Sequence, residues 1–154
     1  MSVTIEALAG FHALPNRGFM EMVGPLYARR EAAGGIVFAL PVEERHCNPM
    51  GICHGGMLTT FADMVIVVTA ALATPGQALG PTVSLTCDFL APAPLGRLVE
   101  GRGRSLRSTR SLGFAECLLT IAGDPVLRAS GIMKLPPPGG GGSLAAILGA
   151  APAA

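Results

Sequence analysis

The second half of the chain alternates apolar and polar residues, as strands do. In the stretch TVSLTCDFL, residues 82–90, apolar side chains from Val83 to Phe89 occupy every second position. This period of two predicts a half-buried strand with polar side chains on its other face. Three more strands are expected at residues 97–104, 112–122 and 126–135, separated by short turns. Four consecutive strands of this kind predict an antiparallel meander.

The first half shows mainly helical spacing. Apolar residues from Phe19 to Tyr27 fall near one helical face, interrupted by Gly24-Pro25, so short helical pieces are expected within residues 10–33. The apolar run Ile36–Leu40 is typical of a strand. Residues 57–73, MLTTFADMVIVVTAALA, predict a long helix that is apolar on nearly every side. Such a helix must be covered, and a curved antiparallel sheet wrapped around it is the expected α+β fold.

The same helix could be mistaken for a membrane span. Its 17 residues are marginal for the roughly 20 that a bilayer requires. Asp63 also lies near its middle, and a carboxylate is costly in lipid. We therefore expect a buried helix of a globular domain and no membrane partner.

The regular pattern ends at Leu135. The remaining residues, 136–154, are rich in proline, glycine and alanine and carry no charged side chain. This composition is typical of a linker and a flexible tail, or at most of one loosely docked helical turn. One domain is therefore expected over residues 1–135, followed by the tail.

Composition narrows the class of partner. The 154 residues suit one domain, and the formal net charge of +1 gives no electrostatic attraction toward nucleic acid. A small molecule or another protein is expected instead. The chain begins MSVTIE, without a secretory signal, and its four cysteines are irregularly spaced. Reduced thiols in the cytoplasm are expected rather than a disulfide framework.

The stretch HCNPMGICHGG, from His46 to Gly56, concentrates residue types that carry chemistry. A zinc site is one interpretation, because two histidines and two cysteines lie within it. Their spacing argues against zinc, since they form two adjacent pairs and neighbours in an extended chain point to opposite sides. The sequence offers no second cluster of Cys and His, so no metal is expected.

A second interpretation is a catalytic turn at the start of a helix. His54-Gly55-Gly56 directly precedes the long apolar helix, whose first N–H groups lack partners and carry the positive end of the helix dipole. Glycines there let an oxygen come close enough to be polarised, as in an oxyanion hole. Further along, Asp63 interrupts the helix, and no Lys or Arg lies between Arg45 and Arg97. A carboxylate without a local ion pair suits a general base or a nucleophile.

Each of these features also has a structural interpretation. The glycines can form a tight turn, His54 can cap the helix, and Asp63 can be solvated. A cysteine nucleophile at Cys47 or Cys53 is a further alternative because both lie beside a histidine, although an adjacent residue rarely has the geometry of a base. The residues alone leave these alternatives open.

Taken together, these residues resemble a known family. The string Asn48-x-x-Gly51-x-x-His54-Gly55-Gly56, followed by Asp63 in an apolar helix and a Val83-Ser84-Leu85 strand, is similar to the hotdog-fold acyl-CoA thioesterases. It is most similar to their PaaI-type, phenylacetate-degradation branch, which is related to the 4-hydroxybenzoyl-CoA thioesterases. The resemblance covers about residues 10–135. It implies the hotdog fold, a curved antiparallel sheet around a long central helix, with active sites at the interface of a homodimer or homotetramer.

The resemblance also implies roles for individual residues. The Gly55 N–H would polarise the thioester carbonyl, Asn48 would hold the thioester or the water, and His54 would sit beside them as a positioning group. Asp63, from the other subunit, would activate water or attack directly, and Ser84 would orient that water. Coenzyme A is part of the substrate, no separate cofactor is expected, and the residues implied to contact it are Gly56, Arg107, Arg110 and Ser111.

Three functions remain compatible with the sequence. The expected one is hydrolysis of acyl-CoA thioesters that carry an aryl or medium-chain acyl group. The second is a hotdog hydratase or dehydratase acting on acyl thioesters, and the third is an acyl-CoA-binding domain without catalysis. The basic residues 104–111 can equally form a solvated hairpin without a role in binding coenzyme A.

Overall fold

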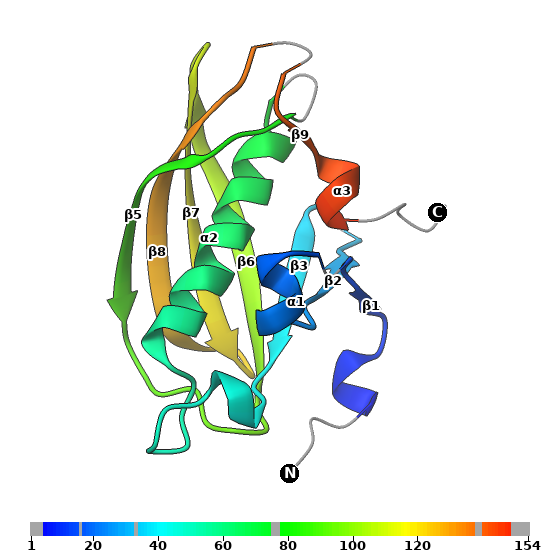
Figure 1. Ribbon diagram of the computed structural model, residues 1–154, viewed down its shortest axis with the longest axis vertical. Helices are drawn as coiled ribbons and strands as arrows, with labels where there is room; N and C mark the ends of the chain where they lie inside the picture. The colour runs from blue at the N-terminus through cyan, green and yellow to red at the C-terminus, as the bar shows by residue number, and fades with distance from the viewer. Residues whose placement is uncertain (1–4, 16, 33, 75–77, 138–139, 149–154) are drawn as a thin grey trace.

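The computed structural model describes residues 5–15, 17–32, 34–74, 78–137 and 140–148. Among these residues, seven strands form one antiparallel sheet in the order β1-β2-β3-β6-β7-β8-β5, which curves around the long helix α2 (Figure 1). The expected α+β architecture is therefore observed. The elements in chain order are η1 (Ile5–Leu8), β1 (His12–Ala13), α1 (Phe19–Val23), β2 (Tyr27–Arg30), β3 (Ile36–Pro41), η2 (Glu44–His46), α2 (Gly55–Leu72), β4 (Ala78–Leu79), β5 (Thr82–Phe89), β6 (Leu98–Ser108), β7 (Leu112–Ile121), β8 (Asp124–Lys134), β9 (Gly142–Ser143) and α3 (Leu144–Leu148).

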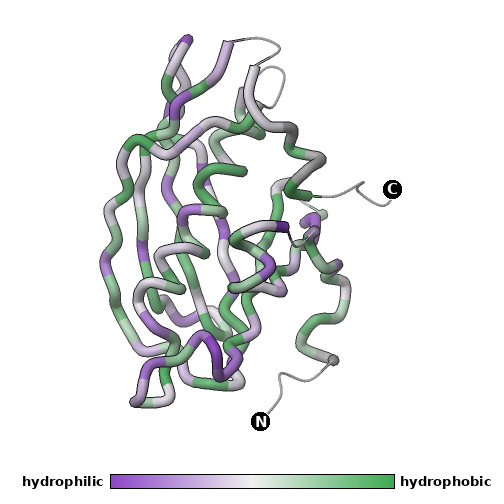
Figure 2. The backbone as a smooth tube through the Cα atoms, viewed as in Figure 1, coloured by the Kyte–Doolittle hydropathy of each residue, from purple (hydrophilic) through white to green (hydrophobic). Residues whose placement is uncertain are grey.

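The helix α2 is the centre of the hydrophobic core. Its residues Phe61, Val65 and Ile66 are fully buried, and β3, buried along nearly its whole length, is one of the most apolar segments of the chain (Figure 2). The sheet approaches α2 closely at Gly103, where a Cβ would lie 1.9 Å from Thr69 Oγ1, so the site requires glycine. By length and composition α2 could cross a membrane, but 56% of it is buried inside this fold, as expected of a core helix.

The sheet differs from the predicted meander in the place of one strand. β6, β7 and β8 are neighbours in sequence order, but β5 pairs with β8, and β6 pairs with β3. The chain between β5 and β6 crosses one end of the sheet, where the Cys53 N–H donates to the Ala93 carbonyl at 2.8 Å and the Leu95 N–H donates to the Gly51 carbonyl at 3.0 Å. This crossing leaves β5 at the edge of the sheet. The predicted meander was therefore wrong for β5.

The predicted helical segment from Phe19 to Tyr27 is helical only in its first part. α1 ends at Val23, and Tyr27 begins β2, which pairs with β3. Proline after Gly24 prevents the helix from continuing. Leu26 is fully buried, but it lies in the extended chain before β2 and not on a helical face.

Residues 140–148 fold back onto the domain. β9 pairs with β4, and α3 follows with Leu144 buried in the core. The docked helical turn that the sequence allowed is thus observed here. Residues 138–139 and 149–154 of the predicted tail lie outside the described residues, and the domain boundary at residue 135 stays a prediction.

Candidate active site

The stretch from His46 to His54 folds into a small loop that directly precedes α2. The His46 carbonyl accepts from the His54 N–H at 2.7 Å, and the Asn48 N–H donates across the loop at 2.9 Å. At the tip, the Asn48 side-chain oxygen accepts from the Met50 N–H at 3.0 Å, and Gly51 has a φ of 73°, which glycine adopts without strain. The loop therefore fixes Asn48 through its oxygen, while its amide NH₂ has no partner among the described residues.

The helix α2 begins with an open backbone donor. His54 is the N-cap, and its Nδ1 accepts from the Gly56 N–H at 2.9 Å. The N–H of Gly55, the first helical residue, has no hydrogen-bond partner in the described part of the chain, as is usual at a helix start. The nearest atom to a Cβ built on Gly55 would be in the Phe89 ring, at 3.1 Å. The cap and an open donor at the positive end of the helix dipole therefore occur together.

Asp63 is held by a hydroxyl that sequence reasoning missed. Its Oδ1 accepts from Thr82 Oγ1 at 2.6 Å, and the side chain is partly exposed. Within the described ranges Asp63 takes part in no ion pair, in agreement with the lack of Lys and Arg in this part of the sequence. A short hydrogen bond to a carboxylate orients it and leaves Oδ2 available to a ligand.

Ser84 does not lie beside Asp63 in this chain. Leu85 packs against the core, so regular alternation would turn Val83 toward α2. A β-bulge between Thr82 and Ser84 shifts the register, and Val83 is 60% exposed. The bulge brings Thr82 to the helix side of the strand. Thr82 is therefore the hydroxyl that bonds Asp63 within one chain, and the role implied for Ser84, orienting the attacking water, stays a prediction.

Gly55 and Asp63 lie well apart along α2. Asp63 follows Gly55 by eight residues, which corresponds to about 12 Å along an α-helix. The donor and the carboxylate of one chain are therefore separated by about two turns of α2.

Arg107, Arg110 and Ser111 lie at the far end of α2 from its open donor. They belong to the exposed tip between β6 and β7 (Figure 1). Gly113, just beyond the tip, lies against Ala70 near the C-terminal end of the helix. The 18 residues of α2 span about 27 Å. Within one chain, these three residues expected to contact coenzyme A are thus remote from the Gly55 N–H, whereas the fourth, Gly56, follows it directly.

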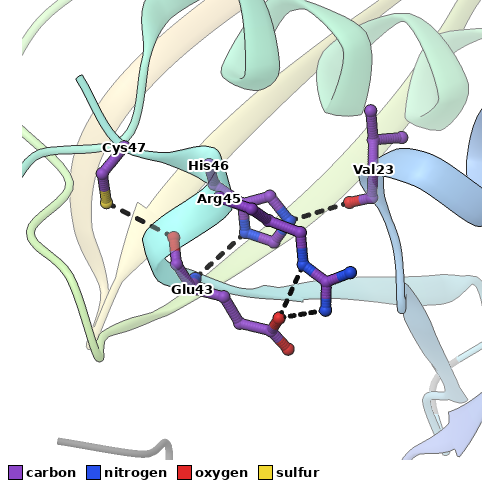
Figure 3. Close-up of polar contacts among 5 residues, drawn as sticks. All are labelled: Val23, Glu43, Arg45, His46 and Cys47. Atoms are coloured by element: carbon purple, nitrogen blue, oxygen red, sulfur yellow. Dashed lines mark hydrogen bonds and ion pairs between the residues drawn. The ribbon is translucent and has the colours of Figure 1, made fainter.

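His46 is a buried histidine that the sequence suggested only as a zinc ligand or as the neighbour of a cysteine nucleophile. Figure 3 shows its ring between two backbone groups: Nδ1 accepts from the Glu43 N–H at 3.0 Å, and Nε2 lies 2.9 Å from the Val23 carbonyl oxygen. Because Nδ1 accepts, Nε2 carries the proton and donates to Val23. Burial lowers the pKa of His46 below its ordinary 6.5, the nearby Arg45 acts in the same direction, and Glu43 opposes them. The ring is thus neutral and fully bonded.

The cysteine and zinc interpretations gain no support from the structure. Cys53 is buried, and burial raises the pKa of its thiol to about 12. Burial also raises the pKa of the Cys47 thiol, and thiols of high pKa are poor nucleophiles at neutral pH. In the ranges that the structure describes, no three metal-ligating side chains are grouped. Both ring nitrogens of His46 are already used in hydrogen bonds.

A groove of about 450 Å³ opens beside the start of α2. Phe19 and Met22 of α1 line one side, and Met57 of α2 lines the other. His54 and Gly56, the residues on either side of Gly55, also line it. The groove is therefore partly apolar and lies beside the residues that flank the open backbone donor.

Comparison with known proteins gives the family. The family described as the thioesterase superfamily matches residues 50–127, which contain Gly55, Asp63 and Thr82. Human acyl-coenzyme A thioesterase 13 is 30% identical over 115 residues, covering 75% of this chain and 81% of the relative. This chain belongs to the thioesterase superfamily.

Solved structures confirm the superfamily's hotdog fold for this chain. Zebrafish thioesterase superfamily member 2 is 27% identical with a TM-score of 0.69, over 77% of this chain and 87% of that one. A variant of the phenylacetic acid degradation protein PaaI from Thermus thermophilus is 26% identical with a TM-score of 0.65, over 75% of this chain and 96% of that one. The resemblance to PaaI-type thioesterases and the expected enzyme class, a thioester hydrolase, are thereby confirmed.

Proposed function

We propose that this thioesterase hydrolyses acyl-CoA at sites that two copies of the chain form together. In each site, the Gly55 N–H of one copy polarises the thioester carbonyl, and the partner's Asp63 activates the attacking water. The observation that carries the proposal is the separation along α2 of an open N–H donor and a carboxylate bound by Thr82.

Hydrolysis of a thioester needs only these two groups, a donor that polarises the carbonyl and a base that activates water. Water adds to the carbonyl carbon as its proton passes to Asp63, and the oxygen of the tetrahedral intermediate is stabilised by the Gly55 N–H at the positive end of α2. The carbon–sulfur bond then breaks, and the proton is returned to the departing thiolate. The products are a carboxylic acid and free coenzyme A. Asn48 holds the thioester or the water with its NH₂, and His54 keeps the turn in place through its cap.

The edge strand β5 supports the assembly of such a site. It has no second neighbour among the described strands, and Val83 and Phe89 are 60% and 56% exposed. An unpaired edge of this length is suited to pairing with another strand. Antiparallel pairing of two β5 strands about a two-fold axis sets the Thr82 end of one against the Phe89 end of the other. Because Thr82 binds Asp63 and Phe89 lies over Gly55, this pairing brings carboxylate and donor together.

The same two-fold symmetry gives the exposed tip between β6 and β7 a role in binding coenzyme A. The tip lies at the Thr82 end of the sheet, since the Ser111 carbonyl accepts from the Leu135 N–H at 2.8 Å and the Pro81 carbonyl accepts from the neighbouring Lys134 N–H at 2.9 Å. In the two-fold pair, the tip of one copy approaches the start of α2 in the other. Its guanidinium groups, from Arg107 and Arg110, then bind the phosphates of coenzyme A.

Gly56 and Ser111 are the two remaining residues proposed to contact coenzyme A, and neither contributes a charge. The Gly56 N–H is already used by His54, so Gly56 contributes space for the ligand and no donor. The Ser111 side chain is exposed at the tip and offers a hydroxyl. Both residues remain predicted contacts.

The apolar groove between α1 and α2 is the proposed acyl site. Its volume of about 450 Å³ lies within the range of ligand pockets. Phe19, Met22 and Met57 favour an aryl or medium-chain acyl group. A homodimer is the smallest assembly that completes the site, and a dimer of dimers is compatible with it. Acyl-CoA is an intracellular metabolite, which fits the cytoplasmic location expected.

The test is thiol release by purified protein from a panel of aryl- and alkyl-acyl-CoAs, combined with analysis of the acyl product. Hydrolysis gives free coenzyme A and the acid, a hydratase adds water to an unsaturated acyl group without releasing thiol, and a binding domain gives neither product. We expect thiol release that the D63N variant loses. A wild type that binds acyl-CoA but releases no thiol across the panel contradicts the proposal.

A further inference from the structure

His46 joins three segments of the chain around the groove. Its ring bonds the Val23 carbonyl at the end of α1 and the Glu43 N–H before η2 (Figure 3). Its own carbonyl accepts from the N–H of His54, the residue that caps α2. His46 is only 3% exposed. The proposed chemistry does not use this ring, so its hydrogen bonds require another explanation.

Besides the packing of Met20 and Val23 against the hydrophobic core, the helix α1 has little else to hold it in place. It has five residues, none of them buried, and so short a helix is not stable by itself. The bond from His46 Nε2 to Val23 is the one side-chain hydrogen bond to α1 found among the described residues. Yet α1 supplies Phe19, Met22 and Val23 to the groove.

We propose that His46 is a positioning residue that holds α1 as a wall of the acyl groove, at a set distance from the turn that carries the Gly55 N–H. The inference rests on the proposed function and adds to it a determinant of acyl specificity. Medium-chain acyl groups reach α1 and depend on this wall, whereas an acetyl group does not reach it. His46 thereby sets the affinity for medium-chain acyl groups without touching the reacting atoms.

Two substitutions distinguish the effects of the two hydrogen bonds that the His46 ring makes. In H46N the shorter amide oxygen can replace Nδ1 and accept from the Glu43 N–H, but nothing reaches Val23. In H46Q the longer amide NH₂ can replace Nε2 and donate to Val23, but the Glu43 N–H loses its acceptor. Each variant is therefore the control for the other, and both remove the imidazole.

We would measure KM and kcat for medium-chain acyl-CoA and for acetyl-CoA with wild type, H46N and H46Q. We expect H46N to raise the ratio of the medium-chain KM to the acetyl KM about tenfold, the effect of losing one hydrogen bond, with kcat unchanged. H46Q should keep the ratio of the wild type. Equal ratios in all three proteins, or the same change in both variants, would overturn the inference.

Amide hydrogen exchange without substrate gives an independent readout. Residues 19–24 should exchange faster in H46N than in wild type or H46Q, while the centre of α2 stays protected. Equal exchange in the two variants would overturn the role of the Val23 bond. A wild type without hydrolysis contradicts the proposed function before any variant is compared, and the exchange experiment still decides whether His46 holds α1.

Discussion

The start and the middle of α2 carry functional groups of different kinds. At the start, the active group is a backbone N–H, and the surrounding loop holds it through backbone bonds and the His54 cap. At the middle, the active group is the Asp63 side chain, which a single hydroxyl orients beside an unpaired sheet edge. The first region is held by internal hydrogen bonds, whereas the second is partly exposed at the edge of the described sheet. Under the proposed function, these two regions are half-sites that meet across an interface between two chains.

Loss of the carboxylate is expected to have the largest effect. D63N keeps the shape of the side chain but removes its charge and basicity, so kcat for acyl-CoA hydrolysis should fall by about 10²–10⁴-fold. Thiol release under saturating substrate measures this. Circular dichroism and sedimentation should show an unchanged fold and assembly, and a D63N variant with wild-type kcat would remove Asp63 from the mechanism.

Loss of the backbone donor should come next. G55P removes the N–H at the first helical position, where proline is well tolerated, and ψ of 137° at His54 suits a residue before proline. Removal of one oxyanion donor costs about 10²–10³ in kcat. G55A is the matched control, since it adds a Cβ near the Phe89 ring but keeps the N–H. Similar losses in G55A and G55P would mean that space, and not the donor, matters here.

The hydroxyl beside Asp63 should have a smaller effect. T82A frees the carboxylate to rotate, and about tenfold lower kcat is expected from the loss of one charge-assisted hydrogen bond. S84A removes the hydroxyl that faces away from α2 and should leave kcat near that of wild type. The reverse outcome, with S84A impaired and T82A normal, would support the water-orienting role predicted for Ser84 and contradict the role given to Thr82.

The smallest expected effect is the pH dependence of the stability that His46 contributes to the fold. The pKa of His46 is lowered in the folded chain, so the unfolded chain binds its proton more readily. The stability that the neutral ring contributes is therefore complete above about pH 6.5 and declines as the pH falls toward the lowered value. The free energy of unfolding of wild type minus that of H46Q, from urea titrations, should decline in this direction. A difference independent of pH would show that His46 does not titrate differently on folding.

The sequence was sufficient to predict those helices and strands whose buried residues recur with a simple period. The apolar run of α2 predicted a central helix, and alternation predicted β5 within one residue of its ends. The open donor at Gly55 was also predictable, because glycines before a helix and unpaired first N–H groups are local features. The pairing partners of the strands were harder to predict. The sequence placed β5 next to β6, whereas β5 pairs with β8.

The residues that sequence reasoning missed act between distant segments. Thr82 meets Asp63 across 19 positions, and only through a bulge that no alternation pattern reveals. His46 meets Val23 across 23 positions, through a ring for which the local sequence offered no such partner. Such contacts depend on where the chain returns after a turn, and composition and periodicity carry little information about that.

The most direct test of a site shared between two chains mixes two inactive variants. G55P lacks the donor and D63N lacks the base, so neither homodimer has a working site. After the two are unfolded and refolded together, half of the dimers are mixed, and each mixed dimer has one site with both groups intact. We expect about a quarter of wild-type activity to return in an equal mixture. Mixed dimers demonstrated by mass spectrometry that remain inactive would contradict the account.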